Sequence, residues 1–438
     1  MTAMGYTLAA FGLILLLSRL KVPLSVAILT GAAALGVLFG LGAGQIGSAA
    51  LAGATRPNSI GLAVITILLL ALSQSMRAGG QLEQIVSLAR AFLRRPAVAM
   101  AALPALIGLL PMPGGALFSA PMVEAAAAGG DESSGRLSAI NYWYRHIWEY
   151  WWPLYPGVIL AAEWTARPLE VFIAQQLPLG LFMVASGVVI FRGLQQDLRA
   201  TGAPAPEDTK RRLLRSTSSI WIILIVWAVG TVVARLVFAH MGFGAEQLKA
   251  RENLSALGKY GPLTVALVAS LVWTARLNGI GPGGLAKIFA GRSLYDLAVL
   301  VLSVMVFGQL LEATNAGWRI GGELQALEIA PILVVGALPF IAGMVTGLAV
   351  GFVGVSFPIV LEVVRAMSGG GATSAYMVLA YACGFLGMML SPLHLCHIVS
   401  NRYFNTTFGP VYRRIIPAVA IMFVLAVGYF ELLRLLGL

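Results

Sequence analysis

The feature that most restricts the fold of this chain is the recurrence of apolar runs long enough to cross a lipid bilayer. A membrane-spanning helix needs about 20 mainly apolar residues, and such runs follow one another from 4–20 and 24–42 onward to the last residues of the sequence. Hydrophobic residues make up 59% of the chain and charged residues 11%, whereas soluble domains carry about 25% charged residues. This composition excludes a water-soluble globule and predicts an all-α polytopic membrane protein that contacts the lipid bilayer.

The basic residues gather in alternate loops between the apolar runs. Counted from the N-terminus, the odd loops hold the clusters: Arg19 and Lys21; Arg90, Arg94 and Arg95; Arg199, Lys210, Arg211, Arg212 and Arg215; Arg276, Lys287 and Arg292; and Arg402, Arg413 and Arg414. Loops rich in lysine and arginine face the cytoplasm. We therefore expect a multi-pass protein of the cell inner (cytoplasmic) membrane with both termini outside. Because the net charge of +11 follows the loops, it does not point to a nucleic-acid partner.

Landmarks of the first half of the sequence return in the same order in the second half. The matched pairs are Gln74 with Arg77-Ala78 and Gln309 with Glu312-Ala313, then Ala102-Leu103-Pro104 and Ala337-Leu338-Pro339, then Ser119-Ala120-Pro121 and Ser356-Phe357-Pro358, and last Trp152-Pro153-Leu154 and Ser391-Pro392-Leu393. Self-similarity of this kind is typical of transporters built from structural repeats. The order predicts a first repeat at 1–192, a cytoplasmic linker at 193–218 and a second repeat at 219–438.

Each repeat is expected to cross the membrane five times. The predicted spans are 4–20, 24–42, 59–76, 136–162 and 171–192, and then 219–239, 261–277, 294–312, 373–400 and 414–436. Proline and glycine interrupt the stretches 97–128 and 328–366, so we expect re-entrant helical hairpins that enter and leave on one side. An odd number of crossings inverts the second repeat relative to the first.

The tip of the first expected hairpin, 110–115, contains Pro111, Pro113, Gly114 and Gly115. Proline ends a helix, and glycine adopts backbone conformations closed to other residues. Non-helical backbone at membrane depth is tolerated only where it is buried in protein or lines a watery cavity, and the N-terminus of the following helix can receive an anion. This tip is therefore predicted to line a solute site.

The second tip, 343–347, contains Thr346 and Gly347 and is followed by further glycines. Small residues at this spacing also pack helices against each other, so both interpretations stay open. Downstream, the prolines in 152–157 and 391–394 are expected to break a later helix in each repeat and to free carbonyl groups for binding. The four interruptions together predict one site near the middle of the membrane.

Three ionisable residues, Arg145, His146 and Glu149, lie in an otherwise aromatic span at 141–150. Charges at this depth are costly and usually functional, and spacings of three and four residues place these side chains on one helix face. Arg145 is expected to neutralise an anionic solute while Glu149 or His146 carries a coupling proton. The alternative is a closed ion pair between Arg145 and Glu149 that only holds the helix. The full set predicted to bind the solute is Pro111, Pro113, Gly114, Gly115, Ser119, Arg145, Trp152, Pro153, Tyr155, Thr346, Gly347, Ser356, Ser391 and Pro392.

His394 and His397 are three residues apart in the second break, and Glu312 stands where the first repeat has Arg77. The residues predicted to couple transport to an ion are His146, Glu149, Glu312 and His394. A metal site that His394 and His397 share with His146 and Glu149 is an alternative, but the sequence favours no metal and no cofactor. Both cysteines, Cys383 and Cys396, lie in apolar context and are interpreted as small buried side chains without a disulfide.

The pattern resembles the ion transporter superfamily, which includes gluconate:proton symporters, dicarboxylate symporters and arsenite exporters. The stretches 111–121 and 141–156 look most like an uncharacterised integral membrane family of the DUF401 type. The resemblance covers nearly the whole chain and implies homodimers and elevator-type alternating access. It transfers no sodium ligands, because the Ser-Asn-Thr motifs of sodium-coupled dicarboxylate carriers are replaced here by 111–115 and 152–155.

The function predicted from these features is secondary active transport of a small, anionic, organic acid-like solute, coupled to protons. A sodium-coupled symporter and an ion/proton antiporter are the alternatives of the same class. An intramembrane enzyme is disfavoured because the sequence has no His-Glu-x-x-His motif and no Gly-x-Ser-Gly motif. A channel would use polar groups at similar breaks, but repeats with two opposed hairpins favour alternating access.

Overall fold

The computed structural model describes residues 2–93, 95–112, 114–127, 133–165, 167–194, 208–242, 251–328, 330–368 and 373–438, and within these ranges it contains helices and no strand. The first half holds α1 (Ala3–Arg19), α2 (Leu24–Leu38), α3 (Ala43–Thr55), α4 (Pro57–Ala78), α5 (Gln81–Arg90), α6 (Pro96–Gly108), α7 (Ala116–Ala127), α8 (Ser134–Arg145), α9 (Pro156–Trp164), α10 (Leu169–Gly187) and the 3₁₀ turn η1 (Val188–Phe191). The second half follows α11 (Thr209–Ser216) with α12 (Ser218–His240), α14 (Glu252–Leu277), α15 (Pro282–Phe289), α16 (Arg292–Ala313), α17 (Ala316–Ala326), α18 (Pro331–Thr346), α19 (Ala349–Ser368), α20 (Thr373–Met389), α21 (Leu395–Tyr403) and α22 (Phe408–Leu435).

The expectation of an all-α polytopic membrane protein is confirmed in its general form. Among the described residues, 7 segments are long and apolar enough to cross a bilayer: Pro57–Ala78, Leu169–Phe191, Ser218–His240, Glu252–Leu277, Arg292–Ala313, Ala349–Ala366 and Phe408–Leu435. The predicted spans 4–20 and 24–42 correspond to the shorter apolar helices α1 and α2. Residues 195–207 of the predicted linker at 193–218 lie outside the described residues.

Proline marks the beginning of several of these helices. It stands in the first turn of α4, α6, α9, α15 and α18, where the missing N–H costs no intrahelical bond and the fixed φ suits a helix. Glycine marks one of the ends, because Gly347 follows α18 in the left-handed conformation with φ of 62°. The positions of proline and glycine in the sequence therefore determine where these helices begin and end.

The succession of helices is the same in both halves. Each half has two helices, a short helix, a long helix, a short helix, a two-helix hairpin, a pair of helices on either side of a break, and a final helix. The hairpins are α6–α7 and α18–α19, and the broken pairs are α8–α9 and α20–α21. Contacts between the halves follow the same correspondence, since α7 packs against α21 and α19 packs against α9.

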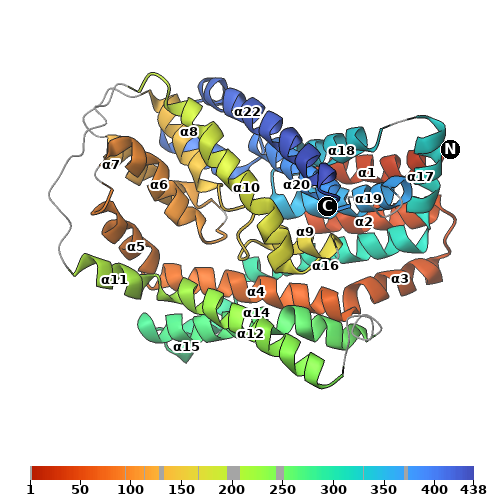
Figure 1. The fold of residues 1–438 in the computed structure, drawn as a ribbon, viewed down its shortest axis with the longest axis horizontal. Coiled ribbons are helices and arrows are strands. Elements are labelled where there is room, and N and C mark those ends of the chain that lie inside the picture. Colours follow the sequence, from red (N-terminus) through yellow and green to blue (C-terminus); the bar gives the residue numbers. More distant parts are fainter. Residues whose placement is uncertain are drawn as a thin grey trace.

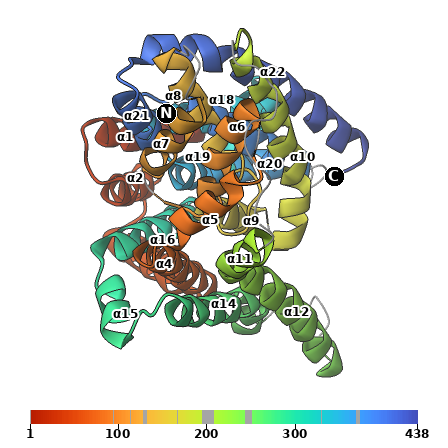
Figure 2. The same cartoon turned by 90° about the vertical axis from the view of Figure 1, so that its left-hand side faces the viewer.

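The helices are arranged around the two broken pairs. Figures 1 and 2 show α12, α14 and α15 along one side of the molecule, with α4 between them and the remaining helices. Contacts of α12 with α14 and of α14 with α4 hold this side together. The hairpins and broken helices pack on the other side, where α22 contacts α8, α10 and α20. The broken helices bring the largest buried side chains of the core, including Trp143, Tyr142, Tyr150 and Tyr381.

Candidate functional site

The first break separates α8, which ends at Arg145, from α9, which begins at Pro156. The intervening segment 146–155 makes turns that bond locally, and Pro153 and Pro156 remove the backbone donors that a continuous helix would need. Gly157 lies against α19, where an added Cβ would fall 2.8 Å from the Cβ of Ala349. The break therefore exists because of its prolines, and a glycine lets the second hairpin approach it.

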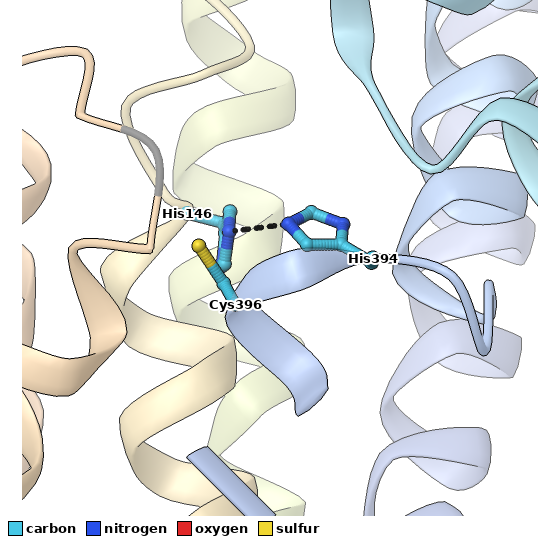
Figure 3. A group of neighbouring side chains, drawn as sticks. All are labelled: His146, His394 and Cys396. Carbon is cyan, nitrogen blue, oxygen red and sulfur yellow. Dashed lines mark hydrogen bonds between the residues drawn. The ribbon is translucent and has the colours of Figure 1, made fainter. Parts of the chain in front are cut away.

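The second break separates α20, which ends at Met389, from α21, which begins at Leu395. Pro392 interrupts the helix ladder here, and the side chain of Ser391 caps the turn by accepting from the Leu393 N–H at 3.1 Å. The two breaks meet at their histidines, because Nε2 of His146 lies 3.1 Å from Nε2 of His394. Figure 3 shows these two rings pointing toward each other, with Cys396 beside them. The structure thus brings together two predicted coupling residues that are 248 positions apart.

The tips of the hairpins are held by the breaks. Nη2 of Arg145 donates to the carbonyl of Met112 at 2.8 Å, and the guanidinium lies against Gly115, where a Cβ would fall 2.4 Å from Nη2. In the second half, Oγ of Ser391 donates to the carbonyl of Met344 at 2.7 Å. In both halves a side chain of a broken helix binds a carbonyl of a hairpin tip.

Arg145 and Glu149 form a buried ion pair at the first break. Nη1 of Arg145 lies 3.4 Å from Oε1 of Glu149, and the same oxygen lies 3.8 Å from Nε2 of His146. Arg145 is 1% exposed and Glu149 8% exposed, so each charge depends on the other for compensation. Nε of Arg145 has no hydrogen-bond partner. The Tyr155 side chain lies beside the same guanidinium.

A second polar network lies between the first hairpin and the two broken helices. Oγ of Ser119 donates to Oδ1 of Asn141 at 2.6 Å, and Nδ2 of Asn141 donates to the Ala116 carbonyl at 2.9 Å and to Oγ of Ser400 at 2.7 Å. All three side chains are fully buried. Ser119 is thus placed near the site, with its hydroxyl already bonded to Asn141.

Other predicted residues take structural partners in this conformation. The Tyr155 hydroxyl donates to the Gly108 carbonyl at 2.6 Å, whereas Thr346 and Ser356 donate to carbonyls of their own helices. Trp152 is buried with an unpartnered indole N–H. Pro111 and Gly114 belong to the first tip and Pro153 and Pro392 to the breaks, while Pro113 lies outside the described residues. The solute-binding assignments all stay predictions.

Two cavities are lined by corresponding landmarks of the two halves. One, of about 250 Å³, is lined by residues that include Arg77, Phe118, Pro121 and the tip residue Met112. The other, of about 180 Å³, is lined by residues that include Gln309, Glu312 and Pro358. Each cavity therefore lies between the end of the long helix and the hairpin of one half. Met112 lines the first cavity, and its carbonyl is the one to which Arg145 donates.

Glu312, predicted as a coupling residue, lies in the second cavity and not with the two histidines. Its carboxylate is exposed and lies 3.4 Å from Nη1 of Arg56. His397 is buried, but both of its ring nitrogens lack a hydrogen-bond partner, and the ring stacks on Tyr142 at a centroid distance of 4.5 Å. Only His146, Glu149 and His394 of the predicted coupling set are therefore neighbours in this structure.

Sequence analysis missed Cys396 and Asn141 as members of the site. Sγ of Cys396 lies within 4.8 Å of the facing nitrogens of His146 and His394. The available signal was the tetrapeptide His394-Leu395-Cys396-His397, in which metal-binding residue types cluster within a helix break. Asn141 carried the weaker signal of an amide in an aromatic span.

Comparison with known proteins places the chain in one family. The family profile described as "Protein of unknown function (DUF401)" matches residues 5–236 and 262–432. No curated protein matches the chain. A solved structure of MtrF from Neisseria gonorrhoeae, which represents a class of antimetabolite efflux pumps, aligns at 14% identity with a TM-score of 0.44, covering 88% of this chain and 83% of that one. None of these similarities specifies a solute or a coupling ion.

Proposed function

We propose that this chain, which belongs to the DUF401 family of unknown function, is a secondary active transporter that moves a small, anionic, organic acid-like solute across the inner membrane. The observation that carries the proposal is the buried pair of Arg145 and Glu149 at the point where both breaks and the first hairpin tip meet. Buried charges at membrane depth are costly and are retained where they bind or move ions.

Arg145 supplies the positive charge that would hold the solute. A guanidinium stays protonated in proteins and presents a planar fork that matches a carboxylate. In this conformation Nη1 faces Glu149, Nη2 binds the Met112 carbonyl, and Nε is unpartnered. A solute carboxylate that replaced Glu149 would accept a hydrogen bond from Nη1 and would compensate the guanidinium charge in its place.

Glu149 supplies the means of coupling to a proton. When a proton neutralises Glu149, the carboxyl group no longer compensates Arg145, and the solute anion takes over that role. The buried site holds no net charge in either condition, which keeps the desolvation cost low. His146, whose Nε2 lies 3.8 Å from Oε1 of Glu149, is the neighbouring group that would pass the proton. This scheme favours protons over sodium as the coupling ion.

Alternating access would come from inverted repeats with an elevator-type movement. Its support is the repeated succession of helices, the reciprocal packing of α7 on α21 and α19 on α9, and the two cavities lined by corresponding landmarks. The hairpins and broken helices form the moving part, and α4, α12, α14 and α16 the stationary part. We further propose a homodimer with both termini outside, and a transporter rather than a channel or an enzyme.

Uptake into proteoliposomes tests the proposal. Radiolabelled succinate, gluconate and phosphate serve as probes, with a proton gradient, a sodium gradient or neither. We expect one of these anions to enter under the proton gradient. Arg145→Ala should abolish this uptake, and Arg145→Lys should restore little of it, because an ammonium lacks the planar fork.

Glu149→Gln separates solute binding from proton coupling. The variant should exchange labelled for unlabelled anion across the vesicle membrane and should no longer respond to the proton gradient. The control is Glu83→Gln, which changes a carboxylate outside the buried site, on α5 in the wall of the first cavity. Full proton-driven uptake by Arg145→Ala, or response of wild type to the sodium gradient alone, would overturn the proposal.

A further inference from the structure

The two breaks bring three metal-ligating side chains to one point. Nitrogens of His146 and His394 and Sγ of Cys396 all lie within 4.8 Å of one another, and all three residues are buried. Figure 3 shows the thiol beside the two facing rings, with His394 and Cys396 on the second break and His146 on the first. The solute scheme uses Arg145, Glu149 and, for passing a proton, Nε2 of His146, and it leaves this thiol without a role. A metal on Nε2 would prevent His146 from passing the proton, so the two roles of His146 exclude each other.

Backbone carbonyls fix the orientation of both rings. Nδ1 of His146 lies 2.6 Å from the Tyr142 carbonyl, and Nδ1 of His394 lies 3.4 Å from the Met388 carbonyl. A carbonyl oxygen only accepts hydrogen bonds, so we assign the ring proton to Nδ1, from the short contact in His146 and from the longer contact in His394. Both Nε2 atoms then present lone pairs to each other across 3.1 Å. Two facing lone pairs at this distance repel unless a cation lies between them.

A histidine whose other ring N–H donates to a backbone carbonyl is the usual arrangement of a metal ligand. Metal–nitrogen bonds of about 2.0 Å place two ligand nitrogens roughly 3.3 Å apart at a tetrahedral angle and roughly 3.5 Å apart around an ion with three ligands. The observed separation of 3.1 Å between the Nε2 atoms is slightly shorter than both values. We propose that His146, His394 and Cys396 bind one thiophilic transition-metal ion, with Cu⁺ preferred over Zn²⁺.

Ligand type and charge both favour the monovalent ion. A thiolate with two imidazoles suits copper and zinc rather than magnesium or calcium. Binding forms a metal–sulfur bond, breaks the S–H bond of Cys396, and releases the proton to water. Cu⁺ and the thiolate cancel, as do Arg145 and Glu149 beside them, so the buried cluster stays neutral. Zn²⁺ would leave one uncompensated positive charge at membrane depth, where it is costly.

The metal would join the two halves of the chain at their breaks. His146 follows α8, whereas His394 and Cys396 flank the beginning of α21, so one ion would hold both broken helices as one body. This inference concerns metal binding by the resting protein and does not rest on transport of an anion. Its failure and the failure of the proposed function are therefore distinguishable.

Copper titration of the purified full-length protein tests the site. The protein in detergent is titrated anaerobically with Cu⁺ against a chromophoric Cu⁺ chelator, and copper X-ray absorption reports the ligands. We expect one Cu⁺ per chain, bound by one sulfur and two nitrogens. Cys396→Ser and His394→Ala should each weaken binding at least about 100-fold. The matched controls Cys383→Ser and His240→Ala, which change the other cysteine and an exposed histidine, should bind as wild type does.

If a variant fails to fold, the copper X-ray absorption measurement on wild type still tests the site. If wild type binds neither Cu⁺ nor Zn²⁺, the metal site is wrong, and the two histidines share a proton instead. Copper ligation without sulfur, or unchanged affinity in Cys396→Ser, would overturn the assignment of Cys396. Tighter binding of Zn²⁺ than of Cu⁺ in the same competition would overturn the preference for the monovalent ion.

Discussion

Gly115 lies so close to Arg145 that a β-carbon added to the glycine would fall 2.4 Å from Nη2 and 2.7 Å from Nε of the guanidinium. The tip of the first hairpin is thus shaped around a single charged group. The absence of a side chain at Gly115 lets Nη2 reach the Met112 carbonyl. The tip and the first broken helix therefore cannot change their relative position without moving this guanidinium.

Gly115→Ala should displace the guanidinium and reduce anion uptake more than it reduces stability. Forcing a methyl group into a packed site costs about 1–3 kcal/mol, and the displaced charge loses its bond to Met112. Uptake into proteoliposomes and thermal unfolding are measured on the same preparation. Gly44→Ala is the control, because a Cβ there meets nothing within 4 Å. Wild-type uptake by Gly115→Ala would contradict the role of this contact.

The buried ion pair should respond non-additively to substitution. Removing one partner of a buried pair leaves an uncompensated charge and costs about 3–5 kcal/mol, so Arg145→Met and Glu149→Gln should each lower the unfolding temperature. The double variant should recover much of that loss but not transport. Thermal unfolding of the four proteins gives the coupling free energy. Additive losses would show that Arg145 and Glu149 do not compensate each other.

Asn141→Leu should destabilise the protein because it leaves buried polar groups without hydrogen-bond partners. The substitution removes the acceptor of the Ser119 hydroxyl and the donor to the Ala116 carbonyl, and each buried polar group left unpaired costs about 1–3 kcal/mol. Thermal unfolding should shift by several degrees. Ser48→Ala, which removes an exposed hydroxyl bonded within its own helix, should not shift it.

The two cavities should open to opposite faces of the membrane. In inverted repeats, the landmarks Arg77 and Glu312 take opposite orientations, and both side chains are exposed in the structure. Arg77→Cys should react with a membrane-impermeant thiol reagent from the cytoplasmic side and Glu312→Cys from the outside. Right-side-out and inside-out vesicles are compared, and the unsubstituted protein, whose two cysteines are buried, gives the background. Labelling of both variants from one face would reject the inverted arrangement.

The sequence predicted the framework of the site better than its contacts. Proline and glycine act locally, so the breaks at Pro153 and Pro392 and the hairpin tips were visible in the sequence and are present in the structure. The ion pair of Arg145 and Glu149, which the sequence offered as the alternative to solute binding, is present. It forms although the two residues do not share a helix, because α8 ends at Arg145 and Glu149 lies in the turns of the break.

Contacts between the halves were not predictable in the same way. The pairing of His146 with His394 depends on how two broken helices meet, and no local pattern specifies that distance. Cys396 was interpreted as a small apolar side chain because an isolated cysteine usually is one. Glu312 was assigned to coupling from its repeat position, whereas in the structure its nearest charged group is Arg56.

The meeting of the two breaks also determines when the site can form during synthesis. Ribosomes deliver the N-terminal half first, and at that stage Asn141 lacks Ser400 and His146 lacks His394, which follows 248 residues later. Asn141 and His146 must therefore wait in the membrane without these partners until the C-terminal helices have been inserted, whereas Arg145 and Glu149 already compensate each other. Nascent chains stalled before α20 should accordingly be bound by membrane proteases and chaperones. Chains long enough to insert α21 should no longer be bound by them.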